Sequence, residues 1–466
     1  MEHLINRLRF ELHCSDEESA FNFRENFAAT FQGQITNAAD ELCSKYVGEE
    51  EWLRIDKIEI DLGKFTPGAF NTNFAEVFKS KFEKELKQKL SGISSIEKKA
   101  SGQISRLEIL KYFLQKGVLP WWAVESEVNI DDLAIELITN KPETIKQFFY
   151  DQIYNNNVWL RTVFQLNRKS KLLLFLLIDE LKAPKDLFVK WKQQLNVLFK
   201  SEIAAEINIT DDLIDDIILK NTPRIFQNLG QEDILLEIFK NNISSIFTDN
   251  QTRIDKIISD NKSDFLQVNY KLSGDKKNET IINTSVPQQK FLQKNNEEDI
   301  TNKYVVKHAG IILLAPFLKA YFTNLQLLHD KEWKNKDAQY KAVHLLKFLS
   351  TGTQNIPEYN LTLEKIMCGL NIEEPLPLEV FLDENEMNES TSLLESVIEH
   401  WKALKNTSVY SLRESFLKRD GLLTIKDNGW LLQVERKTLD VLIDSIPWGY
   451  SILNFPWSDR VIFVEW

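Results

Sequence analysis

Paired carboxylates are the residues of this sequence that come closest to a catalytic pattern. Asp-Asp pairs occur at residues 131–132, 211–212 and 215–216. Two neighbouring carboxylates are the groups that acid–base hydrolysis uses. All three pairs fall near the expected start of a helix, where negative charge complements the helix dipole. This second interpretation is the simpler one, so we expect the acids to be structural.

Metal, nucleotide and nucleophile signatures are absent from the sequence. The six histidines form no H-E-x-x-H motif, and the three cysteines Cys14, Cys43 and Cys368 form no C-x-x-C. There is no G-x-x-x-x-G-K-[ST], no G-x-G-x-x-G and no G-x-S-x-G. The sequence therefore predicts a protein that is not an enzyme, with no catalytic residues, no metal site and no cofactor.

Tryptophans are the other residues whose spacing suggests a function. Four of them lie in the last 37 residues, and two more follow Pro120. One interpretation is a small aromatic core; the other is an anchor for a partner protein, because Trp dominates interface hot spots. We keep as candidate partner-binding residues Trp121, Trp122, Trp430, Trp448, Trp457 and Trp466.

Composition excludes several functional classes. The chain has 466 residues, 57 Lys and Arg against 69 Asp and Glu, and a net charge of −12. This acidic balance argues against nucleic-acid binding, which depends on cations meeting phosphates. No apolar run reaches the ~20 residues of a membrane-spanning helix, and the N-terminus resembles no secretory signal. Few Gly (15) and Pro (12) with many Phe (29) and Trp (11) predict helix-rich packing with aromatic anchors.

The expected elements place these residues in a mostly α fold with α+β ends. Residues 1–95 predict a β-α-β-α module: apolar and polar residues alternate over 7–14 and 52–63, a capping box starts at Ser15, and a stripe of Phe and Leu over 74–90 has helical spacing.

Residues 104–270 predict a region of short helices. Within it, residues 129–133 followed by Pro142 resemble residues 208–213 followed by Pro223, which suggests a weak internal repeat of two copies.

The second half of the chain predicts three further segments. Residues 271–302 are polar and predict a flexible linker. Residues 303–415 predict a second helical region. Residues 416–466 predict a Trp-rich β-containing module, because Asp427-Asn428-Gly429 is a strong hairpin turn between two alternating segments.

Several segments together resemble the tape measure proteins of phage-tail-like contractile injection systems, a bacterial family. The similarity includes FLQKGVLPWW at 113–122, HAGIILLAPFL at 308–318 and the Trp-rich end from Gly429 to Trp466. Further matching segments lie at 3–8, 55–63, 342–346, 368–370 and 373–375. The family resemblance implies a structural component that sets the length of the inner tube during assembly.

The resemblance also implies partners and a location. The partners would be the tube, the baseplate or spike, and the cap of the particle, with no nucleic acid, no membrane insertion and no small-molecule substrate. We expect the protein in the cytoplasm during assembly and inside the tube afterwards. As a single helix, 466 residues would span roughly 700 Å, whereas the helix stops and strands predict compact domains. An assembly chaperone or adaptor scaffold that does not fix length is therefore a second hypothesis.

Overall fold

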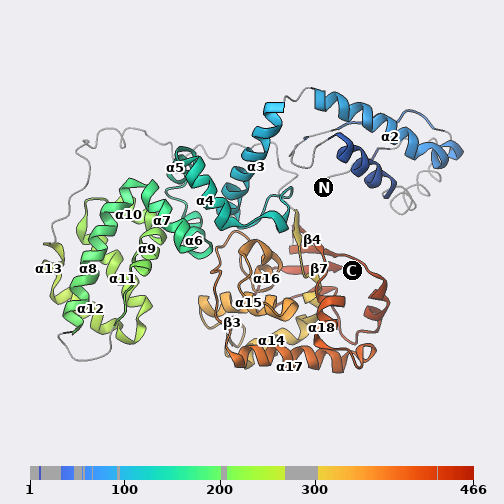
Figure 1. Ribbon diagram of the computed structural model, residues 1–466. Helices are drawn as coiled ribbons and strands as arrows, with labels where there is room; N and C mark the ends of the chain where they lie inside the picture. Colours follow the sequence, from blue (N-terminus) through green and yellow to red (C-terminus); the bar gives the residue numbers. More distant parts are fainter. Residues whose placement is uncertain are drawn as a thin grey trace. The chain divides into compact units, whose positions relative to one another are not determined.

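A computed structural model describes residues 10–11, 33–46, 55, 58–65, 67–91, 95–200, 207–267, 303–427 and 429–466 (Figure 1). The chain divides into two compact units. One contains Met1–Leu110 with Trp121–Val124, and the other contains Lys111–Pro120 with Glu125–Trp466. The described residues are mostly helical, with a small sheet near the C-terminus. None of the described helices is long and apolar enough to cross a membrane.

The N-terminal unit is held together by the predicted aromatic stripe. Phe74, Phe78 and Phe82 of α2 (Pro67–Ser91) are buried and stack on one another, with ring centroids 6.0 and 5.6 Å apart. They share one core with the buried side chains of a helix over residues 33–46, of which Ile35 is the first. The stripe is thus the core of this unit.

The described part of the N-terminal unit shows no β-α-β module. Residues 7–14 lie almost wholly outside the described residues, and residues 58–65 are not in a strand. The alternation over this second segment is nevertheless real, because Ile58, Ile60 and Leu62 are half-buried against the helical core. A period of two fixes which side chains are buried, but a strand also needs a hydrogen-bonded neighbour.

The middle region, defined here as residues 125–267, consists of short helices. Its aromatic core contains Trp159, Phe188, Trp191 and Phe239, all fully buried. The helix α3 (Ser95–Lys116) precedes this region along the chain. The α-helices of the region are α4 (Ile130–Asn140), α5 (Pro142–Asp151), α6 (Asn156–Gln165), α7 (Arg168–Leu177), α8 (Lys182–Lys200), α9 (Asp211–Lys220), α10 (Thr222–Gln227), α11 (Glu232–Ile246), α12 (Gln251–Asp260) and α13 (Lys262–Leu266). Its 3-10 turns are η1 (Glu125–Glu127), η2 (Asp179–Leu181) and η3 (Thr248–Asn250).

The two similar sequence segments of the middle region have the same local structure. The side chain of Asn129 caps α4 and that of Thr210 caps α9. Each helix is followed by one that opens with a proline, Pro142 in α5 and Pro223 in α10. Caps and prolines therefore produce the same helix pair twice.

The C-terminal region, defined here as residues 303–466, has its own core. Among the described residues, the buried members of this core all come from 303–466 apart from Val118. The helical elements are η4 (Ala309–Leu314), α14 (Ala315–Asn324), α15 (Lys336–Thr351), η5 (Glu358–Asn360), α16 (Thr362–Met367), α17 (Glu384–His400), η6 (Lys402–Leu404), α18 (Val409–Leu412), the π-turn η7 (Arg413–Leu417) and η8 (Thr438–Ser445).

A five-stranded sheet in the order β1-β4-β5-β7-β6 covers part of this core. The predicted hairpin is confirmed, since Lys426 of β4 pairs with Gly429 of β5. β7 then joins β5 in parallel, and the other neighbours are antiparallel. The strands are β1 (Lys303–Val306), β4 (Gly421–Lys426), β5 (Gly429–Val434), β6 (Ile452–Leu453) and β7 (Val461–Glu465); β2 (Leu328–His329) and β3 (Glu332–Trp333) form a separate ribbon.

Candidate functional site

The paired acids of α9 are ion-paired with cations of the two preceding helices. Lys192 and Lys185 of α8 pair with Asp211 and Asp215, and the second of these N–O distances is 2.8 Å. Arg168 and Lys171 of α7 pair with Asp212 and Asp216 at 2.8 and 2.6 Å. We call these contacts the α9 ion pairs. They tie three helices together.

The electrostatics of the α9 ion pairs differ between exposed and buried members. Lys192 holds the pKa of Asp211 below its usual value. Burial raises the pKa of Asp215 and Asp216 and outweighs the opposing pull of their lysines. Asp131 of α4 likewise serves structure, because it accepts hydrogen bonds from the Asn167 backbone N and the Ser170 hydroxyl at 2.7 and 3.1 Å. These contacts favour the structural interpretation of the acids.

The C-terminal tryptophans are fixed by hydrogen bonds of their indole N–H groups. Trp448 donates to the Leu313 carbonyl at 3.0 Å, and Trp457 donates to the Met367 carbonyl at 2.9 Å. Trp466 donates to the Asp440 carboxylate at 3.0 Å. Trp430 is buried in the core face of the sheet. All four rings therefore belong to the packing of the C-terminal region.

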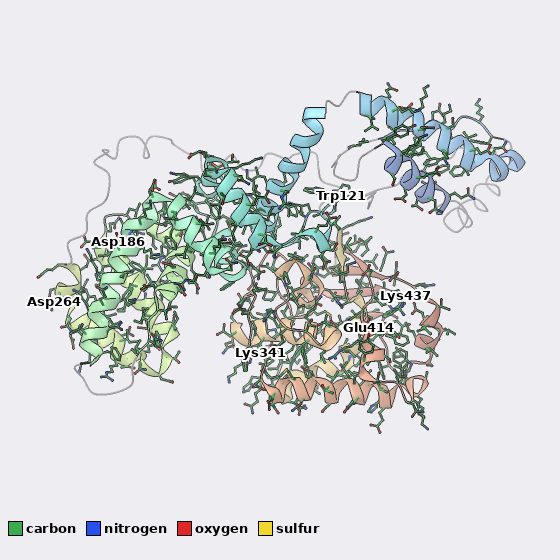
Figure 2. The ribbon with its side chains drawn as sticks, in the orientation of Figure 1. Trp121, Asp186, Asp264, Lys341, Glu414 and Lys437 are labelled. Atoms are coloured by element: carbon green, nitrogen blue, oxygen red, sulfur yellow. The ribbon has the colours of Figure 1, made fainter. Side chains whose placement is uncertain are left out.

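Trp121 and Trp122 belong to the N-terminal unit. Trp121 is labelled in Figure 2. It exposes 39% of its surface, the largest exposure among the six candidate tryptophans. Trp122 is half-buried. Since an anchor must be accessible, partner binding by tryptophan stays a prediction that applies best to Trp121.

A cluster of three fully buried charged side chains joins the middle region to the C-terminal region. Arg161 of α6 donates from Nε to Glu358 Oε2 at 3.0 Å, and Lys365 of α16 donates to Glu358 Oε1 at 2.6 Å. None of the three exposes more than 1% of its surface. Arg161 also donates to the Leu114 and Glu373 carbonyls at 2.5 and 2.7 Å. We call these three residues the Arg161 cluster.

The rest of the Arg161 cluster is also satisfied by hydrogen bonds. Lys365 donates to the Ile372 and Glu374 carbonyls at 2.8 and 2.7 Å. Its burial lowers its pKa. Such complete pairing is what a buried charge requires. Sequence reasoning missed this cluster because Arg161 and Glu358 lie 197 positions apart and belong to no local pattern.

A second buried cluster surrounds Lys347 of α15. Its Nζ lies 2.8 Å from His308 Nδ1, donates to the Asn360 carbonyl at 2.7 Å, and lies 3.3 Å from the Glu364 carboxylate. Burial and the neighbouring lysine lower the pKa of His308 to about 3, so Nδ1 of its neutral ring accepts a hydrogen bond from the Lys347 ammonium group. Burial raises the pKa of both Glu364 and the Cys368 thiol.

The Lys347 cluster lacks the features of a reactive site. A thiol with a raised pKa stays protonated and is a poor nucleophile or ligand. Among the residues that the structure describes, no group of three His, Cys, Asp or Glu side chains is placed to hold a metal ion.

Comparison with protein families shows that nearly the whole chain matches one family. The family model described as "Contractile injection system tape measure protein" matches residues 2–466. The chain belongs to this family. Searches of the curated proteins and of the solved structures found no match.

Two segments that carry the similarity to tape measure proteins contain glycines in close contacts. Gly117 has φ +74°, and an added Cβ would lie 2.3 Å from Glu358 Oε1 and 2.7 Å from Arg161 Nη2. At Gly310 an added Cβ would lie 1.7 Å from the Phe416 carbonyl oxygen. In this tape measure family member, the 113–122 segment thus provides the space into which the Arg161 cluster packs.

Proposed function

We propose that this protein is a structural, non-enzymatic component of a bacterial extracellular contractile injection system that sets the length of the inner tube during assembly. The observation that carries the proposal is the match of the tape measure family over residues 2–466. Membership in this family implies that the protein belongs to such a particle and contacts its other components.

The arrangement of charged groups supports a structural role. Five of the six paired acids are engaged: the four of α9 in the α9 ion pairs, and Asp131 in hydrogen bonds from the Asn167 backbone N and the Ser170 hydroxyl. The buried charges of the Arg161 cluster are matched by partners within the chain. Charged groups that are already neutralised by fixed partners stabilise a fold and leave little reactivity for a substrate.

Partners and location follow from the family as proposals. The partners are the tube, the baseplate or spike, and the cap, with Trp121 as the first residue to test for contact. The protein acts in the cytoplasm during assembly and inside the tube of the mature particle. The segments 1–95, 104–270, 271–302, 303–415 and 416–466 stay proposed domain boundaries. A strand over residues 7–14 stays a proposal, whereas residues 58–63 of the second expected strand are not in a strand.

A second function, assembly chaperone or adaptor scaffold, is favoured by one observation. The longest described helix, α2, has 25 residues and is therefore only about 38 Å long. The other described helices are shorter and pack into aromatic cores. A folded protein of this kind binds tube subunits as a compact body, whereas a ruler must extend.

A nested deletion series separates the two functions. We would remove residues 248–267, 229–267 and 208–267 in cells that assemble the particle, and measure tube length by electron microscopy. A ruler shortens the tube in proportion to the residues removed, by about 1.5 Å per residue if helical and about 3.3 Å if extended. The longest deletion then removes roughly 90 or 200 Å.

The control for the deletion series keeps the chain length constant. The double variant Asp215→Asn and Asp216→Asn weakens the contacts of α9 with α7 and α8 and leaves the number of residues unchanged. A ruler predicts normal tubes in this variant. Normal tube length in all three deletions would overturn the ruler and support the adaptor scaffold.

A further inference from the structure

We propose that the contact surface between α6 and residues 358–378 is a release point, at which the middle region separates from the C-terminal region while both stay folded. We call this contact surface the α6 interface. The inference concerns a conformational change of the chain and holds for a ruler and for an adaptor alike.

The first argument is that the two regions have separate cores. The middle region packs around Trp159, Phe188, Trp191 and Phe239. The buried C-terminal core is drawn from residues 303–466 and Val118. Separation at the α6 interface therefore leaves the aromatic centre of each region intact.

The second argument is that polar groups make the contacts across the α6 interface. Besides the Arg161–Glu358 pair, Gln165 donates to the Leu376 carbonyl at 2.7 Å and accepts from the Glu358 backbone N at 3.1 Å. The Leu378 backbone N donates to the Phe164 carbonyl at 3.1 Å. Neighbouring hydrogen bonds run from Asn157 to the Glu373 carbonyl and from Asn360 to Glu125. One neighbouring contact is apolar, the edge-to-face packing of Phe113 on Tyr359.

Polar contacts of this kind favour reversible separation. Groups that are hydrogen-bonded in the closed form become hydrated in the open form, so the net free energy that holds a buried ion pair together is small. Surfaces between parts of one chain that move are typically polar for this reason. The closed arrangement stays specific because the fork of Arg161 fits only one set of acceptors.

Glu358 keeps a counter-charge after the two regions separate. When Arg161 leaves, the Glu358 carboxylate keeps Lys365, which comes from its own region and lies at 2.6 Å. Arg161 moves into water with α6. Neither region is left with a single unpaired buried charge, which is the state that makes breaking an ion pair costly.

Hydrogen exchange of the unmodified full chain tests the release directly. The backbone N–H groups of Glu358 and Leu378 donate across the α6 interface, so they exchange when it opens. We expect peptides that cover 355–361 and 375–381 to exchange at least tenfold faster, after correction for intrinsic rates, than peptides around Phe239 and Leu346 in the two cores. Equal protection at all four sites would overturn the proposal.

A pair of variants distinguishes release from a merely structural role. In Arg161→Met, the peptides that contain Glu358 and Leu378 should exchange at least tenfold faster than the same peptides of the unmodified chain. The Phe239 and Leu346 peptides should exchange at unchanged rates. The matched control is Arg419→Met, which removes an equally buried arginine that pairs with Asp440 inside the C-terminal region at 2.7 Å. The control should not accelerate exchange at the α6 interface selectively. If Arg161→Met raises exchange at all four sites together, the interface is part of one cooperative structure and the proposal fails.

Discussion

The middle and C-terminal regions use charge in opposite ways. The α9 ion pairs of the middle region range from exposed to partly buried. The Arg168–Asp212 side chains expose 70% and 49%, and those of Lys185–Asp215 expose 26% and 7%. In the C-terminal region the charged side chains around Glu358 and Lys347 are withdrawn from water. Exposed pairs contribute little to stability and tolerate change, whereas buried charges must be matched individually. The exposed Arg168–Asp212 pair is thus expected to tolerate substitutions that the buried clusters around Glu358 and Lys347 do not.

The largest expected effect comes from Glu358→Gln. The amide keeps the shape of the side chain but leaves Arg161 and Lys365 as two buried cations without a counter-charge. Removing one partner of a buried pair costs about 3–5 kcal/mol. Denaturant unfolding of the purified chain measures the loss. A loss below about 1 kcal/mol would show that the cluster is hydrated, and would remove the contrast between the two regions.

Gly117→Ala should cost about 2–5 kcal/mol of unfolding free energy, from two sources. A left-handed backbone costs an L-residue about 1–2 kcal/mol, and the added methyl group would overlap Glu358 and Arg161, which adds about 1–3 kcal/mol. The control is Gly230→Ala in the middle region, where φ is +84° and no atom lies within 4 Å of the added Cβ. Equal losses of unfolding free energy in the two variants would contradict the close packing at Gly117.

Acidification should weaken the C-terminal region selectively. The histidines lie at positions 3, 13, 308, 329, 344 and 400, so the middle region has none. Burial lowers the pKa of His344 to about 4 from an ordinary value of 6.5. Its contribution to stability is complete above pH 6.5 and is lost as the pH falls toward 4, by about 2 kcal/mol at pH 5.

Two buried acids of the middle region respond to acid in the opposite direction from His344. Burial raises the pKa of Asp215 and Asp216, so their contribution is complete below their ordinary pKa and falls as the pH rises through the raised value. Hydrogen exchange of each region at pH 7 and 5, corrected for intrinsic rates, measures the difference. His344→Gln retains an N–H for the Pro377 carbonyl, 2.9 Å from His344 Nε2, and should reduce the acid sensitivity. If both regions lose protection from exchange equally at pH 5, His344 does not cause the acid sensitivity of the C-terminal region.

The same contrast explains how far the sequence could predict the structure. The caps Asn129 and Thr210 and the turn at residues 427–429 are local signals, and each produced the expected element. β1 was not predicted as a strand because its four residues form one only by pairing with β4, more than a hundred positions later. The Arg161 cluster was missed for the same reason. Gly117 was recognisable as a helix stop, but the charges that it accommodates come from distant segments.

The smallest expected effect is that of Asp212→Asn in the middle region. The pair with Arg168 has good geometry at 2.8 Å, but water screens both side chains and each has other rotamers to occupy when the contact is lost. We expect the free energy of unfolding to fall by less than about 1 kcal/mol and the loss to shrink further in 1 M salt, where the Debye length is about 3 Å. Asp132→Asn, in the first turn of α4, is the control for a helix-dipole effect without the Arg168 contact. A salt-insensitive loss as large as that of Glu358→Gln would mean that the α9 ion pairs are as essential as the buried cluster, and that exposure is not what separates the two regions.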